Sequence, residues 1–324
     1  MVDVICVGAG ISGSLLGHLL KDHMRVLLVD KSRGPGGRMS TRRIMHEGRE
    51  YKFDHGAQFF TARSHQFKTL IDPLVGMNLI KEWHSQIPHA SYSSVKESTR
   101  FCGTTGMNSL AKFFSSDVEC HFEWQCTKIS NVSDRWILES DKGEVIHCRT
   151  LVVAIPATQA LRLFSDGRLQ LTPLSQISYQ PTWAVMLGAT HSFRLPPPHA
   201  AWFKPESGIE WVSDNQKKGI STNPSLTIHL TQQMSLNLLQ STPEQVIDFA
   251  KAQLQELLPT DLTIQTAHRW LLSRSSHQRF ERGFYQSESL PDLYFIGDAF
   301  EGGRVEGAAL SAIAAAKAIK ERYS

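Results

Sequence analysis

The sequence predicts an α/β fold with a second, α+β domain inserted into it. Three stretches of the chain carry this prediction. The N-terminus has an apolar strand pattern, a glycine turn, a helical run and a second strand that closes on Asp30. Residues 160–265 contain short apolar runs typical of an antiparallel sheet. The C-terminus returns to an apolar strand and then to a helix of small residues that we expect to reach about Tyr323.

The glycine turn has the spacing Gly8-x-Gly10-x-x-Gly13. In a Rossmann-type βαβ unit the first glycine makes the tight turn, the second lets the backbone approach a pyrophosphate, and the third lets the helix pack closely on the sheet. The pyrophosphate lies at the helix N-terminus, where free N–H groups and the dipole favour negative charge. Asp30, about 20 residues further on, is placed to accept hydrogen bonds from a ribose diol. The alternative is a glycine-rich packing turn, but the flanking strands, helix and acid favour dinucleotide binding.

Length and composition exclude several classes of protein. A chain of 324 residues exceeds one typical core, so one large or two smaller domains are expected. The net charge is +3 and no basic run marks a nucleic-acid groove, so we predict no nucleic-acid partner. No stretch approaches the roughly 18 apolar residues of a membrane span, and three glycines interrupt the apolar N-terminus, which argues against a signal peptide. We therefore expect no membrane association.

The cysteines indicate a reducing compartment. There are five, an odd number without a CxxC pair, which suits free thiols better than a disulfide framework. The pairs Cys120-His121 and His147-Cys148 lack the spacing of zinc ligands, so we predict no metal. The expected location is cytoplasmic.

Two further motifs follow Asp30. In Lys31-Ser-Arg-Gly-Pro-Gly-Gly37-Arg38 a guanidinium follows paired glycines, and it can bind a pyrophosphate through two hydrogen bonds. In Asp54-His-Gly56-Ala-Gln58-Phe-Phe-Thr61 a glycine gives the backbone room, and an amide side chain is within reach of a flat heterocycle.

Together with the glycine turn, these motifs resemble the FAD-binding signatures of the flavin amine oxidase superfamily, and most closely those of its renalase-like members. The resemblance continues at Gly106-Met-Asn-Ser-Leu110, Pro181-Thr-Trp-Ala-Val185 and Ala267-His-Arg-Trp270, and at the end of the chain. It spans nearly the whole sequence. The first and last motifs are specific for FAD, whereas the middle ones are specific only for this subfamily.

The resemblance implies a two-dinucleotide-binding flavoprotein with one non-covalent FAD. Near the C-terminus, Gly297-Asp298 resembles the pair that such flavoproteins use on the ribityl chain, and the helix that follows would point its positive end at the flavin pyrimidine edge. The alternative for this helix is simple alanine-rich packing. The backbone of Cys126 is implied beside the adenine. The predicted FAD contacts are Gly8, Gly10, Ser12, Gly13, Asp30, Lys31, Gly37, Arg38, Gly56, Ala57, Gln58, Cys126, Gly297, Asp298, Glu306, Gly307 and Ala308.

Between residues 62 and 160 the pattern predicts one helix and several strands. The helix is amphipathic and is expected to end near Pro73; its apolar face is Phe67, Leu70, Ile71 and Leu74. Short extended pieces are expected at Trp83 and Tyr92. Three strand-like runs follow, with a hairpin turn at 141–143 between the last two: Val118–Ile129, Trp136–Glu139 and Val145–Val153.

Residues 160–265 predict a sheet and a capped helix. The expected strands are Trp183–Ala189, Ala200–Phe203, Ile209–Ser213 and Leu226–Leu230. Thr242-Pro-Glu-Gln245 is a helix start with a capping box, and the apolar face that follows is Val246, Phe249, Ala250, Leu254, Leu257 and Leu258. We assign 1–70, 100–160 and 265–324 to the FAD-binding domain, and 71–99 and 161–264 to the substrate domain.

The last predicted feature is the substrate pocket. Its candidate residues are Gln58, Trp183, Trp270 and Asn215, to which His55, His268 and Trp211 are added as residues that either contact substrate or pack in the core. Lys217 and Lys218 are expected in a solvated turn.

Three functions remain open. The first is a renalase-like oxidase that takes hydride from 2- and 6-dihydro isomers of NAD(P)H and passes electrons to oxygen, giving hydrogen peroxide. The second is an amine oxidase or another FAD oxidoreductase acting on a small metabolite. The third is a flavin-binding interaction protein without turnover. Composition and spacing do not separate the first two functions, but the resemblance to the subfamily favours the first.

Overall fold

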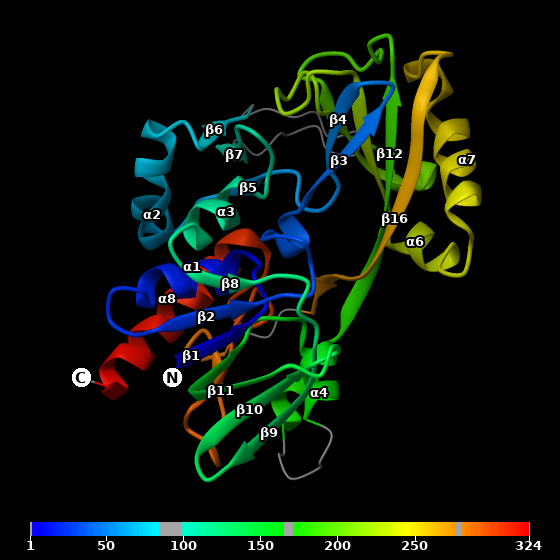
Figure 1. The fold of residues 1–324 in the computed structure, drawn as a ribbon. Coiled ribbons are helices and arrows are strands. Elements are labelled where there is room, and N and C mark those ends of the chain that lie inside the picture. The colour runs from blue at the N-terminus through cyan, green and yellow to red at the C-terminus, as the bar shows by residue number, and fades with distance from the viewer. Residues whose placement is uncertain (1, 84–98, 165–170, 277–279, 324) are drawn as a thin grey trace.

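The computed structural model describes residues 2–83, 99–164, 171–276 and 280–323, and Figure 1 shows their arrangement. A large mixed sheet lies beside the N- and C-termini, and a five-stranded antiparallel sheet stands apart from it at the other end of the molecule. This confirms the predicted Rossmann-type α/β fold with a second α+β region.

The first sheet has the strand order β17-β18-β11-β1-β2-β8, with the β10 and β9 hairpin joined to β11. The pairs that β1 makes with β2 and with β11 are parallel, as are β2–β8 and β11–β18. The strands are β1 (Val2–Val7), β2 (Val26–Val29), β8 (Glu119–His121), β9 (Cys126–Val132), β10 (Arg135–Ser140), β11 (Val145–Val153), β17 (Tyr285–Gln286) and β18 (Leu293–Phe295).

Both faces of the central strands β1, β2 and β18 are buried, so these strands are apolar on both sides. Alternate residues of β1 enter different cores: Val4 and Cys6 pack in one, Ile5 and Val7 in the other. The first core is completed by α1 (Ile11–Leu20), α2 (His65–Gly76), α3 (Ser109–Ser115) and α8 (Arg304–Tyr323). The second contains α4 (Ala157–Leu163) and α5 (Thr172–Ser175).

The second sheet has the order β13-β14-β15-β12-β16 and is antiparallel throughout. Its strands are β12 (Tyr179–Ala189), β13 (Ala200–Trp202), β14 (Ile209–Asp214), β15 (Ser225–Leu230) and β16 (Leu262–Ser275). Helices α6 (Gln232–Asn237) and α7 (Pro243–Leu254) accompany it, and α7 runs along its outer face in Figure 1. The predicted capping box is confirmed, because Thr242 and Gln245 exchange side-chain and backbone hydrogen bonds.

Smaller elements connect the two sheets. The hairpin of β3 (Thr41–His46) and β4 (Arg49–Asp54) packs Tyr51 and Phe53 against Met186 and Ile264 of the second sheet. A three-stranded sheet consists of β5 (Phe60–Thr61), β6 (Ile80–Glu82) and β7 (Arg100–Gly103), and short 3-10 turns occupy Gly37–Met39, Pro205–Ser207 and Gln255–Leu257.

Two local predictions were wrong. Helix α2 does not end near Pro73; it continues to Gly76, because the buried residues Phe67, Ile71 and Leu74 hold its face and Met77 N–H closes the last turn on the Pro73 carbonyl. The run Val118–Ile129 is two strands, β8 and β9, which extend opposite ends of the sheet. Trp83 lies just beyond β6, and Tyr92 lies outside the described residues.

The assignment of the chain to two domains stays a prediction, but two of its boundaries cut continuous elements. The boundary at 70/71 falls inside α2, whose buried residues share the core of α1 and α8. The boundary at 264/265 falls inside β16, which pairs with β12 from Leu262 to Ser275. No helix of the described ranges has the length and apolarity that a membrane crossing needs.

Candidate active site

The glycine turn between β1 and α1 is packed at its two ends and open in the middle. A Cβ at Gly13 would lie 1.9 Å from the Gly8 carbonyl oxygen, and Gly8 has φ +110° with the Ala154 carbonyl 2.9 Å from where its Cβ would be. A Cβ at Gly10 would have no atom within 4 Å. Helix α1 therefore begins beside open space, and Gly10 at its N-cap offers no side-chain cap, so the free N–H groups of its first turn can receive an anion.

Asp30 ends β2 next to this turn, as predicted. Its Oδ2 accepts the Ala9 N–H at 2.7 Å and its Oδ1 accepts the Ser32 N–H at 2.8 Å. Lys31, which follows, is exposed. The carboxylate is thus held at the edge of the glycine turn, where a ribose contact stays a prediction.

The Gly-Gly-Arg motif lies directly on the glycine turn. Gly36 N–H donates to the Ala9 carbonyl at 2.9 Å, and a Cβ at Gly37 would be 3.3 Å from the Gly10 Cα. The Arg38 guanidinium makes a two-pronged ion pair with Asp298, and its Nη1 also donates to the Ser273 carbonyl at 3.3 Å. Arg38 was predicted to contact the pyrophosphate and Asp298 the ribityl chain of FAD. In the structure these two side chains bind each other.

The start of α8 is fitted closely against α1. Gly307 can carry no side chain, because a Cβ there would lie 2.0 Å from the Glu301 carbonyl oxygen, and Ser12 Oγ donates to the Ala308 carbonyl at 2.9 Å. Gly297, after β18, has φ +145° and no atom within 4 Å of where its Cβ would be. Gly297 N–H donates to Ser311 Oγ of α8 at 3.1 Å, so the open backbone is tied to the same helix that Ser12 ties to the glycine turn.

Glu306 does not direct its carboxylate to this open side. Its two oxygens accept the N–H groups of Arg63 and Ser64 at 2.7–3.1 Å. These are free N–H groups at the start of α2, where a negative charge is favourable. The side chain thus ties α8 to α2, although sequence analysis expected it among the cofactor contacts.

A cluster of rings from the second sheet surrounds the 54–58 turn. The His55 carbonyl accepts Trp270 Nε1 at 2.8 Å and His229 Nε2 at 3.1 Å. The ring centroids of His55 and Trp270 are 5.1 Å apart, and those of His268 and Trp270 are 4.4 Å apart. Gly56 passes so close to Arg38 that a Cβ would lie 2.0 Å from the Arg38 carbonyl oxygen.

The histidines of this cluster are uncharged near neutral pH. Burial, reinforced by His268 and Arg42, lowers the pKa of His55 to about 3, and burial together with Arg42 lowers the pKa of His268 to about 4. The rings beside Gly56 therefore form a neutral, aromatic surface.

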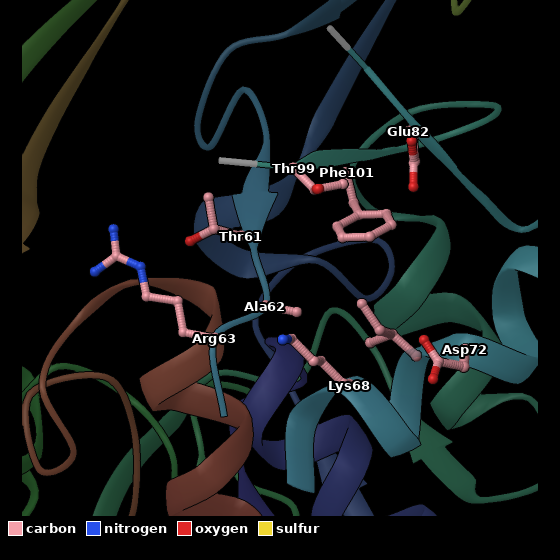
Figure 2. Close-up of a pocket in the computed structure, with 9 residues that line it drawn as sticks. Thr61, Ala62, Arg63, Lys68, Asp72, Glu82, Thr99 and Phe101 are labelled. Carbon is pink, nitrogen blue, oxygen red and sulfur yellow. The ribbon is translucent and has the colours of Figure 1, made fainter. Parts of the chain in front are cut away.

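A separate surface cavity of about 470 Å³ lies between α2, β5 and β7 (Figure 2). Its lining includes Thr61, Lys68, Asp72 and Phe101. None of the residues predicted to contact cofactor or substrate lines it, so it is not the candidate active site.

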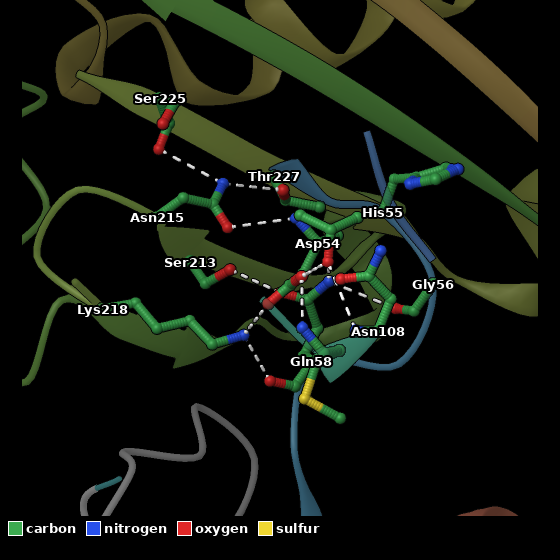
Figure 3. Close-up of polar contacts among 12 residues, drawn as sticks. Asp54, His55, Gly56, Gln58, Asn108, Ser213, Asn215, Lys218, Ser225 and Thr227 are labelled. Carbon is green, nitrogen blue, oxygen red and sulfur yellow. Dashed lines mark hydrogen bonds and ion pairs between the residues drawn. The ribbon is translucent and has the colours of Figure 1, made fainter. Parts of the chain in front are cut away.

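Beneath the 54–58 turn is a buried polar network that sequence analysis missed (Figure 3). Lys218, expected in a solvated turn, is fully buried and pairs with the fully buried Asp54 at 2.7 Å. Its Nζ also donates to the Gln58 carbonyl at 2.5 Å and lies 4.9 Å from the centre of the Trp83 ring. No signal in the sequence separates Lys218 from exposed Lys217, because the partner acid is 164 residues away.

Comparison with known proteins identifies the family. Residues 76–320 match the family described as flavin containing amine oxidoreductase, and residues 6–74 match the NAD(P)-binding Rossmann-like domain. The chain belongs to the flavin amine oxidoreductases. It is 26% identical to renalase of Mus musculus over 345 residues, covering all of both chains.

Solved structures of two oxidases share the fold. Cyclohexylamine oxidase from Brevibacterium oxydans IH-35A superimposes with a TM-score of 0.76 at 14% identity, and a putrescine oxidase variant with 0.75 at 12%. Each comparison covers 99% of this chain and 99% of the other.

FAD is the cofactor of this flavin amine oxidoreductase, and the site fits it. The open backbone at Gly10 and Gly297 leaves room for a ligand that the closed positions Gly13 and Gly307 do not. Arg38, Asp30 and the first turn of α1 would hold the pyrophosphate and ribose, and the N-terminus of α8 would face the ring. FAD supplies the redox chemistry, and the protein supplies binding, orientation and electrostatics. The individual contacts stay predictions.

The structure corrects the expected positions of three substrate-pocket candidates. Trp183 lies on the helix-covered face of β12, where its ring packs in the second-sheet core and its Nε1 donates to the Leu238 carbonyl. Asn215 is fully buried. Its Nδ2 donates hydrogen bonds to Thr227 Oγ1 and the Ser225 carbonyl, and its Oδ1 accepts the Asp54 N–H. Gln58 Nε2 donates hydrogen bonds to the Asp54 and Gly56 carbonyls, and its Oε1 accepts one from the Ser213 hydroxyl. Of the four candidates, only Trp270 is partly exposed beside the ring cluster.

Cys126 opens β9 and is half-buried, as its expected backbone role allows. Burial raises the pKa of its thiol to about 12, so it is not a reactive thiolate. All five cysteines are unpaired. The described residues contain no group of three or more His, Cys, Asp or Glu side chains that could hold a metal ion.

Proposed function

We propose that this flavin amine oxidoreductase oxidises the 2- and 6-dihydro isomers of NAD(P)H to NAD(P)⁺, as a renalase-like oxidase. The dihydronicotinamide carbon is the hydride donor and flavin N5 the acceptor, and oxygen reoxidises the flavin to give hydrogen peroxide. Similarity to a renalase over the whole chain supports this choice within the family.

The observation that carries the proposal is the neutral ring cluster beside Gly56. An amine substrate must lose a proton to react, and an alkylammonium has a pKa of about 10. Imidazoles whose pKa values have fallen to about 3 and about 4 are poor acceptors for that proton. The buried ammonium of Lys218 is already bound to Asp54 and is no free base. A dihydronicotinamide needs no base, because losing hydride makes it an aromatic cation.

The position of α8 also supports hydride transfer. Its N-terminus carries the positive end of the helix dipole, and would stabilise negative charge that develops at the flavin pyrimidine edge. Selectivity among isomers would follow from distance, because the reacting carbon must lie about 3–3.5 Å from N5. A pocket that places C2 or C6 there holds C4 away.

Rapid anaerobic mixing tests the proposal. Oxidised enzyme is mixed with the 2-, 4- and 6-dihydro isomers and with a panel of primary and secondary amines, and the visible flavin band is followed. We expect the 2- and 6-dihydro isomers to bleach it fastest and the amines to leave it unchanged. Bleaching by an amine while the dihydronicotinamides are inert would overturn the proposal in favour of the alternative, an amine oxidase.

We also propose that the FAD is held non-covalently, since no cysteine or histidine of the four FAD motifs resembles a flavin-linking position. The purified protein should be yellow, and acid or heat should release all the flavin into the supernatant. Flavin retained by the precipitate would contradict non-covalent binding. A cytoplasmic location stays a prediction from the five free thiols.

A further inference from the structure

The buried pair of Lys218 and Asp54 joins parts of the chain that lie far apart in sequence. Asp54 Oδ2 binds Lys218 Nζ at 2.7 Å, while Oδ1 accepts Thr41 Oγ1 at 2.6 Å and the Met107 N–H at 2.9 Å. The carboxylate thus connects the β3–β4 hairpin, the start of α3 and the turn after β14. Glycine is required at 106, because its φ is +133° and a Cβ there would lie 2.4 Å from Thr41 Oγ1, the hydroxyl that Asp54 binds.

The pair also braces Gln58. Lys218 Nζ donates to the Gln58 carbonyl at 2.5 Å, and Gln58 Nε2 donates to the Gly56 carbonyl at 3.2 Å and to the Asp54 carbonyl. Ser213 Oγ, on β14, donates to Gln58 Oε1 at 2.7 Å. Every polar atom of the Gln58 amide is therefore bound within the protein, and the amide closes the 54–58 turn on itself.

Stability alone is a weak reason for such a pair. Removing an ammonium and a carboxylate from water is costly, and an apolar pair of similar volume is often as stable or more so. The pair instead lies under the turn that contains Gly56 and Ala57, at the junction of the two sheets. Figure 3 shows the Lys218 side chain reaching from the turn after β14 to Asp54 and Gln58.

We propose that Lys218 is a positioning residue for the flavin reaction. Through Asp54 and Gln58 it holds the backbone of Gly56 and Ala57, where the flavin ring would bind, and its charge neutralises the Asp54 carboxylate beneath this turn. The inference rests on the flavin chemistry of the family. Only its kinetic test uses the proposed donor.

The experiment compares the holoenzyme with the variants Lys218→Met, Asp54→Asn, the double variant and Ser213→Ala. Lys217→Met is the matched control, because Lys217 is exposed on the same turn. Two quantities are measured: the flavin reduction potential, by equilibration with a redox dye, and the limiting rate of anaerobic reduction by 6-dihydro-NAD. The potential does not depend on the donor, so it tests the inference even if the proposed substrate is wrong.

In Lys218→Met the Asp54 carboxylate loses its counter-ion but keeps the hydrogen bonds from Thr41 Oγ1 and the Met107 N–H, which favour its ionised form. The uncompensated negative charge under the turn should disfavour electron uptake by a flavin bound there. We expect its potential to fall and its limiting rate to fall about tenfold or more, since small misplacements of reacting groups are costly. The double variant restores neutrality, so its potential should return towards wild type while its rate stays low. Ser213→Ala keeps both charges and should lower the rate alone, and Lys217→Met should change neither quantity.

A purely structural role predicts a different pattern. Lys218→Met and Ser213→Ala would then melt at lower temperature while keeping the wild-type potential and a limiting rate within twofold, and that result would overturn the inference. If Lys218→Met does not fold, Ser213→Ala decides alone, because it removes one hydroxyl and leaves the ion pair intact.

Discussion

The glycine turn at residues 8–13 and the turn at 54–58 are both predicted to contact FAD, but they are built differently. In the first, the backbone itself makes the site: Gly13 is closed by the Gly8 carbonyl, and Gly10 is left open. In the second, side chains of the other sheet hold the backbone, through the rings of Trp270 and His229 and the ammonium of Lys218. Substitutions in the first region should act through steric conflict, and those in the second through lost partners and charge.

The largest effect is expected at Gly13. A Cβ in Gly13→Ala would lie 1.9 Å from the Gly8 carbonyl oxygen, so the strand and helix must move apart. We expect the apoprotein to lose about 3 kcal/mol of unfolding free energy, as overpacked sites do. Gly10→Ala is the control, because its Cβ meets no protein atom within 4 Å; it should weaken FAD binding and leave unfolding by urea unchanged. Equal unfolding energies for the two variants would contradict the steric account.

The next effect concerns Arg38. In Arg38→Ala, loss of the predicted charge-assisted, two-pronged contact with the pyrophosphate should cost about 2 kcal/mol of binding free energy, or about thirtyfold in FAD affinity. The same substitution leaves Asp298 without its ion-pair partner. Arg63→Ala is the control, since Arg63 is exposed and makes its contact with Glu306 through the backbone. Equal FAD dissociation constants, measured by fluorescence titration, would show that the pyrophosphate lies elsewhere.

The second region should make the protein sensitive to acid. Folded His55 stays neutral down to a pKa of about 3, whereas an unfolded imidazole takes up a proton near pH 6.5. Between these two pH values the unfolded chain binds more protons than the folded chain. The unfolding free energy therefore does not change with this residue above about pH 6.5. Below that pH it decreases, by up to about 1.4 kcal/mol per pH unit for this residue.

Denaturant unfolding at pH 7 and pH 5 measures this slope. His55→Phe should reduce the slope by the share of His55 and leave the part due to His268 and His229, whose pKa values are lowered to about 4. His65→Phe, at the exposed start of α2, should leave it unchanged. A slope that His55→Phe does not alter would place the acid-sensitive group elsewhere.

The smallest effect is expected at the N-cap of α7, where a substitution should change the stability of the second sheet and its helices but not cofactor binding. Thr242→Ala removes the N-cap of α7 and should cost about 1 kcal/mol of unfolding free energy, with FAD affinity unchanged. Ser241→Ala, one residue earlier and outside the capping box, should have no effect on either quantity. A change in FAD affinity in Thr242→Ala would show that α7 is coupled to the flavin site.

Local patterns predicted much of the fold correctly. The four strands expected between residues 183 and 230 match β12 to β15, and the capping box at Thr242 and the helix up to Tyr323 are confirmed. These features depend on residues within one element, so the sequence contains the full signal. Pro73 was misjudged because core packing of α2 outweighs the lost N–H in its last turn.

The sequence by itself determined the glycine turn and the acid that follows β2, because Gly13 is required by its contact with Gly8, and Asp30 accepts the N–H groups of Ala9 and Ser32 within the same N-terminal unit. Only the tertiary structure decided the rest of the site. It buried Lys218 against Asp54, turned Trp183 towards the C-terminal end of α6 and brought Trp270 to the His55 carbonyl. Each of these outcomes depends on which face of a strand meets a residue far away in the chain, and strand register across two sheets sets that choice.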